Sequence, residues 1–126
     1  MDRRKVLVVD DEPHLLKITK LNLERTGKYE VRTLSDSTQT LAEVSSFQPD
    51  VILLDILMPD LDGFELCRQL KAGSATKNIP VIALSALDTD HDRQKMAELG
   101  AADFLIKPIE KQDLIDKIEG VLGRDI

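Results

Sequence analysis

Residues 5–13 read KVLVVDDEP, a run of apolar residues that ends in three acids and a proline. The apolar run at 6–9 contains no polar residue, which is typical of a parallel strand covered on both faces. Acids gathered at the end of such a strand repel one another unless a positive species lies among them. The stretch therefore predicts a buried parallel strand followed directly by a site that binds a cation.

The same pattern recurs along the rest of the chain. Strands are expected at 6–9, 29–34, 51–55, 80–84 and 103–106, and helices at 14–26, 36–46, 63–72, 89–99 and 110–122. The stretch 29–34 alternates polar and apolar residues, as an edge strand with one more exposed face does. Regular alternation of strand and helix predicts an α/β fold of the (βα)5 type, with a parallel sheet between two layers of helices.

Composition limits the classes of function. The 126 residues carry a net charge of −6 and no run of Lys or Arg, so we expect one domain, 1–126, that does not bind nucleic acid by itself. No apolar stretch reaches the roughly 18 residues that span a bilayer, which argues against a membrane segment. The only cysteine, Cys67, lies among apolar residues and is expected in the core. A lone cysteine fits a reducing compartment, and we expect the protein in the cytoplasm.

Chemically active side chains stand where the predicted strands end. They are Asp10, Asp11, Asp55, Ser85 and Lys107. Because parallel strands bring their carboxyl ends to one edge of the sheet, these side chains are expected to meet there. Oxygen ligands alone select a hard divalent ion, so the cluster predicts a site for Mg²⁺ or Mn²⁺, assisted by the ammonium of Lys107.

Two further residues flank this predicted site. Glu12 is expected only to cap the start of the following helix, where the helix dipole favours an acid. The backbone carbonyl of Leu57 is expected to point toward the metal ion, whatever its side chain does. Neither residue is given a chemical role through its side chain.

The acid pair Asp10–Asp11, the D-x-x-M-P-x-x-D-G segment that starts at Asp55, Ser85-Ala86 and Lys107-Pro108 together form a specific pattern. Through them the chain resembles, over essentially its whole length, the receiver domain of bacterial two-component response regulators. The resemblance implies a flavodoxin-like three-layer sandwich with strand order 2-1-3-4-5. It also implies a cis peptide bond between Lys107 and Pro108.

The resemblance also implies a chemistry. Asp55 would accept a phosphoryl group from the phosphohistidine of a sensor histidine kinase or a phosphotransfer protein, in a Mg²⁺-dependent reaction that the domain itself catalyses. Asp11, Asp55 and the carbonyl of Leu57 would hold the ion, and Asp10 would act through water. Lys107 and the Ser85 hydroxyl would contact the phosphoryl oxygens. Autodephosphorylation is expected to be slow, because Leu57 and Leu87 position water poorly.

Phosphorylation is expected to act on a distant face. Ser85 and Phe104 would form the switch, with Phe104 at a position where many relatives carry Tyr. Four charged residues stand near places that other receivers use for homodimers: Arg93, Asp103, Asp113 and Lys117. The alternative is that these four are an ordinary solvated surface, because exposed ion pairs contribute little.

Other classes of protein fit the fold less well or stay open. A nucleotide or flavin module needs a glycine-rich turn after the first strand, where this chain has carboxylates. An aspartyl phosphatase carries a second Asp two residues after its nucleophile, where this chain has Leu57. A docking module that no longer uses phosphorylation stays open, and burial of Asp55 or failure to bind Mg²⁺ would favour it. The chain is either free-standing or a piece of a longer regulator or hybrid kinase with an unknown output domain.

Overall fold

The computed structural model describes residues 3–56, 63–86 and 90–123. The strands are β1 Arg4–Val9, β2 Tyr29–Leu34, β3 Val51–Asp55, β4 Val81–Ser85 and β5 Asp103–Ile106. The helices are α1 Pro13–Glu24, the 3₁₀ turn η1 Ser37–Gln39, α2 Thr40–Phe47, α3 Gly63–Ala72, α4 Asp90–Glu98 and α5 Lys111–Leu122. The five strands are parallel in the order β2-β1-β3-β4-β5, which confirms the predicted (βα)5 flavodoxin-like fold.

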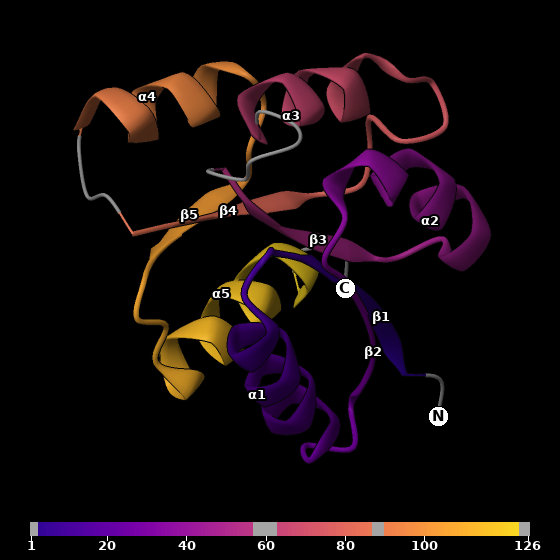
Figure 1. The fold of residues 1–126 in the computed structure, drawn as a ribbon, viewed down its shortest axis with the longest axis vertical. Helices are drawn as coiled ribbons and strands as arrows, with labels where there is room; N and C mark the ends of the chain where they lie inside the picture. The colour runs from indigo at the N-terminus through magenta and orange to yellow at the C-terminus, as the bar shows by residue number, and fades with distance from the viewer. Residues whose placement is uncertain (1–2, 57–62, 87–89, 124–126) are drawn as a thin grey trace.

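Helices cover both faces of this sheet. Figure 1 shows α1 and α5 on one face and α2, α3 and α4 on the other. Successive strand residues point to opposite faces, so Val6 and Val8 pack toward α1 and α5 while Leu7 and Val9 pack into the second core. Both faces are therefore apolar, which explains why most strands lack polar alternation. Every helix in the described ranges is too short or too polar to cross a bilayer.

The edges of the predicted elements need small corrections. β2 is an edge strand, and it buries Tyr29 and Val31 while exposing Glu30 and Arg32, as its alternation predicts. The expected helix at 36–46 is instead a 3₁₀ turn followed by α2. Asp36 caps this turn by accepting a hydrogen bond from the backbone N–H of Thr38 at 3.0 Å. This cap satisfies a free N–H group at the start of the turn.

The strand register aligns the ends that carry the chemistry. Val9 pairs with Leu54, and Asp55 pairs with Leu84. Ser85 pairs with Ile106, the last residue of β5. The residues at and just after these positions therefore lie side by side along one edge of the sheet, where the strands end and the connections to the following helices begin. This edge is where open parallel sheets bind ligands.

Gly63, at the start of α3, fixes how closely this helix approaches the end of β3. A Cβ atom there would clash with the Ile56 Cα and would lie 2.8 Å from the Asp55 carbonyl oxygen. Because both are backbone atoms, Gly63→Ala is expected to lower the free energy of unfolding by about 1–3 kcal/mol or more. Urea denaturation measures this loss.

Gly120→Ala in α5 is the matched control. Apart from its chain neighbours and the surrounding backbone of its own helix, no atom lies within 4 Å of a Cβ built there, and alanine favours a helix over glycine by about 0.8–1 kcal/mol. This variant is expected to be as stable as the wild type or more stable. Equal stability of Gly63→Ala and the wild type would contradict the close approach of α3 to β3.

Candidate functional site

Three aspartates meet at the carboxyl edge of the sheet. Asp10 and Asp11 follow β1, and Asp55 is the last residue of β3. One carboxylate oxygen from each lies within 4.8 Å of the other two. Asp10 is fully buried, Asp11 is exposed, and the Asp55 side chain is only 4% exposed. The strand order thus brings together the three acids that the sequence singles out.

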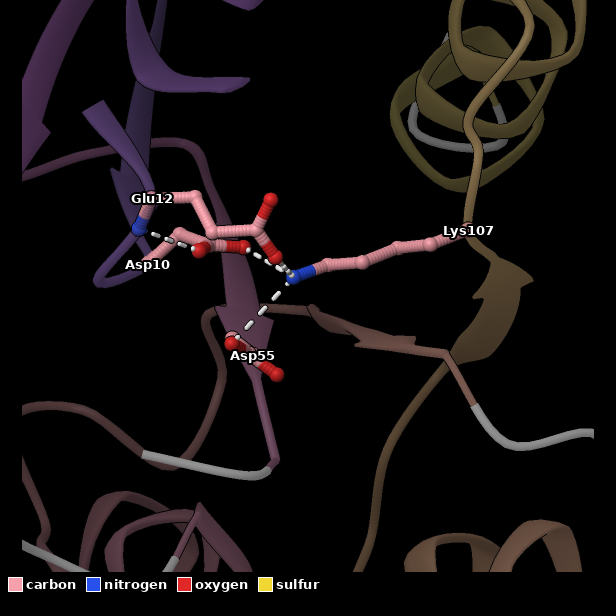
Figure 2. Close-up of polar contacts among 4 residues, drawn as sticks. All are labelled: Asp10, Glu12, Asp55 and Lys107. Atoms are coloured by element: carbon pink, nitrogen blue, oxygen red, sulfur yellow. Dashed lines mark hydrogen bonds and ion pairs between the residues drawn. The ribbon is translucent and has the colours of Figure 1, made fainter. Parts of the chain in front are cut away.

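The ammonium of Lys107 lies among these acids. Its side chain reaches across from the end of β5, as Figure 2 shows, and is only 10% exposed. Its Nζ lies 2.8 Å from Asp10 Oδ2, 2.9 Å from Glu12 Oε1 and 3.3 Å from Asp55 Oδ2. The backbone N–H of Lys107 donates to the Ser85 carbonyl oxygen at 2.7 Å, which ties this residue to the end of β4.

Burial and charge act on these groups in opposite directions. Burial raises the pKa of Asp10, although Lys107 and the backbone N–H of Glu12 act to lower it. Burial by itself would lower the pKa of Lys107, but its contacts with Asp10, Glu12 and Asp55 raise the pKa above its ordinary value. Lys107 is therefore a fixed positive charge at neutral pH, in contact with three carboxylates.

The residues present fit a hard divalent cation. Asp10 Oδ1 accepts a hydrogen bond from the Glu12 N–H at 2.9 Å, whereas Oδ2 is buried and accepts no hydrogen bond of good geometry in the described part of the chain. Its contact with Lys107 is an ion pair by distance only. A buried carboxylate oxygen of this kind beside two more carboxylates is a donor set typical of Mg²⁺ or Mn²⁺.

The side chain of Glu12 does not cap helix α1, as the sequence had predicted it would. It stands at the N-cap position of α1, but its side chain makes no capping hydrogen bond. Its carboxylate instead accepts a hydrogen bond from Lys107 at 2.9 Å. The expectation of a simple helix cap was therefore wrong, because an ammonium within reach offers a stronger, charge-assisted partner than the free N–H groups of the helix. The sequence feature that could have indicated this contact is the position of Glu12 directly after Asp10 and Asp11.

The remaining predicted site residues lie in three places. Ser85 is fully buried at the end of β4, and its backbone carbonyl oxygen accepts a hydrogen bond from the backbone N–H of Lys107. Phe104 is half-buried on β5, with its ring packed against the α2–α4 core and the guanidinium of Arg93 centred 5.3 Å above it. Leu57 and Leu87 lie outside the described residues. The Lys107–Pro108 peptide bond is cis, as predicted.

Two contacts within the chain involve three of the four charged residues of the predicted dimer face. Lys117 on α5 donates to Asp103 on β5 at 3.0 Å, forming a half-exposed ion pair. Arg93 on α4 lies over the Phe104 ring, and Asp113 is exposed in the first turn of α5. This arrangement fits the alternative of an ordinary charged surface as well as a dimer face, so homodimerisation stays a prediction.

Comparison with known proteins decides the family. The model of the response regulator receiver domain matches residues 6–119, which covers all five strands except the start of β1. The chain belongs to the response regulator receiver family. The matched region contains the acids, the lysine and the serine described above.

Curated relatives and solved structures agree with this assignment. The receiver domain is 37% identical over 121 residues to the alkaline phosphatase synthesis transcriptional regulatory protein PhoP of Bacillus subtilis, covering 96% of this chain and 49% of the relative. It is 40% identical over 117 residues to the response regulator PleD of Caulobacter vibrioides, covering 93% and 26%. The chemotaxis protein CheY4 of Vibrio cholerae superposes with a TM-score of 0.90 at 30% identity, covering 96% of this chain and all of that one. The receiver domain thus spans about half or less of these two curated relatives.

Proposed function

We propose that this receiver domain accepts a phosphoryl group on Asp55 from the phosphohistidine of a sensor histidine kinase or a phosphotransfer protein, in a Mg²⁺-dependent reaction. The observation that carries the proposal is the convergence of Asp55 with two further aspartates and the ammonium of Lys107 at one strand edge. Phosphoryl transfer requires mainly positioning and positive charge around the transferred group, and this edge supplies both.

Each residue has a distinct part in the transfer. An Asp55 carboxylate oxygen forms the new bond to phosphorus while the bond from phosphorus to the imidazole nitrogen breaks, and the imidazole leaves with that electron pair. Lys107 stabilises the charge on the phosphoryl oxygens, and the Ser85 hydroxyl donates a hydrogen bond to one of them. Asp11 and Asp55, with the Leu57 carbonyl, would hold Mg²⁺, and Asp10 would act through water. When bound, this ion supplies further positive charge for the transferred group.

A groove beside the site supports docking of a kinase. It has a volume of about 740 Å³, runs between α1 and α5, and includes Lys107 and Ala86 in its lining. Ile18 is 51% exposed and Leu21 is 43% exposed, and both line it with apolar surface. Leu16 of α1 belongs to the core and is not available to a docked kinase. We assign the exposed contacts to Ile18 and Leu21 instead.

One observation favours the docking module without phosphorylation as a second candidate. The Asp55 side chain is 4% exposed, and Lys107 lies against it. Phosphorylation therefore requires Lys107 to move enough for a donor to reach the Asp55 oxygen. The groove that opens beside Lys107 supplies a path for that approach, which is why phosphoryl acceptance remains the better proposal.

The proposal extends to regulation and output. Ser85 and Phe104 would transmit phosphorylation to the face made by α4, β5 and α5, where a homodimer or another partner binds. Leu57 and Leu87 would keep the phosphoryl group long-lived. The curated relatives are longer than the region that matches this chain, so an attached output domain is part of this proposal. We also propose that the protein acts in the cytoplasm.

Intact mass spectrometry tests phosphoryl acceptance directly. The protein is incubated with Mg²⁺ and a small phosphodonor such as acetyl phosphate or phosphoramidate, and a parallel sample contains EDTA. One phosphoryl adduct that EDTA prevents is the expected result, and borohydride reduction, which converts an aspartyl phosphate to homoserine, should mark Asp55. Absence of an adduct with several donors, together with absence of Mg²⁺ binding, would favour the docking module.

A further inference from the structure

Glu12 makes a contact that helix formation does not require. The helix α1 already has its first backbone hydrogen bond, from the Leu16 N–H to the Glu12 carbonyl oxygen at 3.1 Å. The side chain of Glu12 makes no capping hydrogen bond to the first turn of this helix. The Glu12 side chain is therefore available for another partner, and it lies against Lys107, as Figure 2 shows.

Three carboxylates surround the ammonium of Lys107: Glu12 and Asp55 accept hydrogen bonds from Nζ, and Asp10 contacts it as an ion pair. An ammonium group has three N–H donors, and three carboxylate oxygens lie within 3.3 Å of Nζ. A phosphoryl oxygen on Asp55 needs one of these donors. Because three carboxylate oxygens already lie around Nζ, this new oxygen competes with them for a place beside the ammonium.

The three carboxylates differ in how easily they can leave. Asp10 is fully buried and is held by the backbone N–H of Glu12. Asp55 carries the phosphoryl group itself. The Glu12 side chain is 59% exposed, so its carboxylate can rotate into water without an unsatisfied buried charge. Of the three carboxylates, that of Glu12 therefore leaves Lys107 at the lowest cost in free energy.

We propose that Glu12 is a positioning residue that holds the Lys107 ammonium over the acidic cluster while Asp55 is unmodified, and releases it to the phosphoryl group. This inference rests on the proposed function. Glu12 thus competes with the phosphoryl group for Lys107. Removing its charge makes the modified state easier to reach, while the fold loses no packed side chain.

The first experiment follows Lys107 itself. Protein with ¹³C at the ε-carbon of lysine is compared by NMR for wild type, Glu12→Gln and Glu119→Gln. Glu119 is the matched control because it loses the same charge, lies on α5 and pairs with Lys28 at 3.5 Å. In the unmodified protein, Glu12→Gln is expected to shift the Lys107 signal and Glu119→Gln is not. An unshifted Lys107 signal in Glu12→Gln overturns the holding contact.

The second experiment loads the site with beryllium fluoride and Mg²⁺, which form a stable stand-in for a phosphoryl group on a carboxylate. After loading, the Lys107 signals of wild type and Glu12→Gln should coincide, because Glu12 no longer contacts Nζ. Glu12→Gln should also bind the stand-in about two- to fivefold more tightly, the range of one exposed ion pair. Glu119→Gln should bind it as the wild type does.

The outcomes separate this inference from the proposed function. A Lys107 signal that still differs after loading, or an equal gain in affinity for Glu119→Gln, overturns the exchange at Lys107. Failure of the wild type to bind the stand-in contradicts phosphoryl acceptance on Asp55, whereas the comparison in the unmodified protein still decides whether Glu12 holds Lys107.

Discussion

Asp55→Asn is expected to abolish the Mg²⁺-dependent phosphoryl adduct completely. Asparagine has nearly the same shape as aspartate, and its amide still accepts a hydrogen bond from Lys107, which lies 3.3 Å from the Asp55 carboxylate. The amide oxygen is a poor nucleophile, so no acyl phosphate forms. Intact mass after incubation with a small phosphodonor measures the loss.

Asp116→Asn is the control for this substitution. Asp116 is exposed on α5, where its carboxylate accepts a hydrogen bond from the Gln112 amide at 2.9 Å. The adduct should form on Asp116→Asn as on the wild type. Persistence of the adduct on folded Asp55→Asn would place the acceptor elsewhere, and circular dichroism of both variants establishes that they are folded.

Lys107→Met is expected to have the second largest effect. Methionine keeps most of the side-chain volume but leaves the buried carboxylates of Asp10 and Asp55 without their cation. Breaking a buried ion pair from one side costs about 3–5 kcal/mol, so the free energy of unfolding in the absence of metal should fall by about this amount. The rate of phosphorylation should fall by about 10²–10³, as when a group that stabilises transition-state charge is removed.

The loss of stability in Lys107→Met should depend on pH. Burial already raises the pKa of Asp10, and loss of the ammonium raises this pKa further. A group with a raised pKa in the folded state contributes stability at low pH that is lost as pH rises through that pKa. Urea denaturation should therefore find a large deficit at neutral pH that shrinks as pH falls toward about 4.

Two further variants check this interpretation. Lys117→Met breaks the half-exposed pair with Asp103 and should cost less than about 1 kcal/mol. Asp10→Asn, added to Lys107→Met, should restore part of the lost stability, because it removes one uncompensated buried charge. An equal loss for Lys117→Met and Lys107→Met would contradict the special role of the buried cluster.

The sequence alone predicted the placement of Asp10, Asp55 and Lys107, because apolar runs without alternation define parallel strands and parallel strands share one edge. The contact of Glu12 with Lys107 was not predictable in this way. The position of Glu12 follows from the backbone, but its partner depends on the direction of one long, exposed side chain. Hydrophobic periodicity carries no information about that direction.

The surface charges also separate into positions that the sequence predicts and contacts that it does not. Asp103 and Lys117 were predicted as charged residues of a possible dimer face, but not as partners within one chain, because their contact depends on how α5 packs against β5. The stacking of Arg93 on Phe104 likewise depends on the distance between α4 and β5. Patterns within one element are readable from sequence, whereas contacts between two elements require their relative placement.

The two separate cores have a consequence for the evolution and engineering of this domain. Val8 and Leu53 belong to the core under α1 and α5, while Leu7 and Leu54 belong to the core under α2, α3 and α4. Substitutions on opposite sides of the sheet share few neighbours, so their effects on stability should add. The proposed kinase-docking surface on α1 can therefore diverge, or be exchanged together with its own core, while the opposite half and the acidic edge of the sheet stay unchanged.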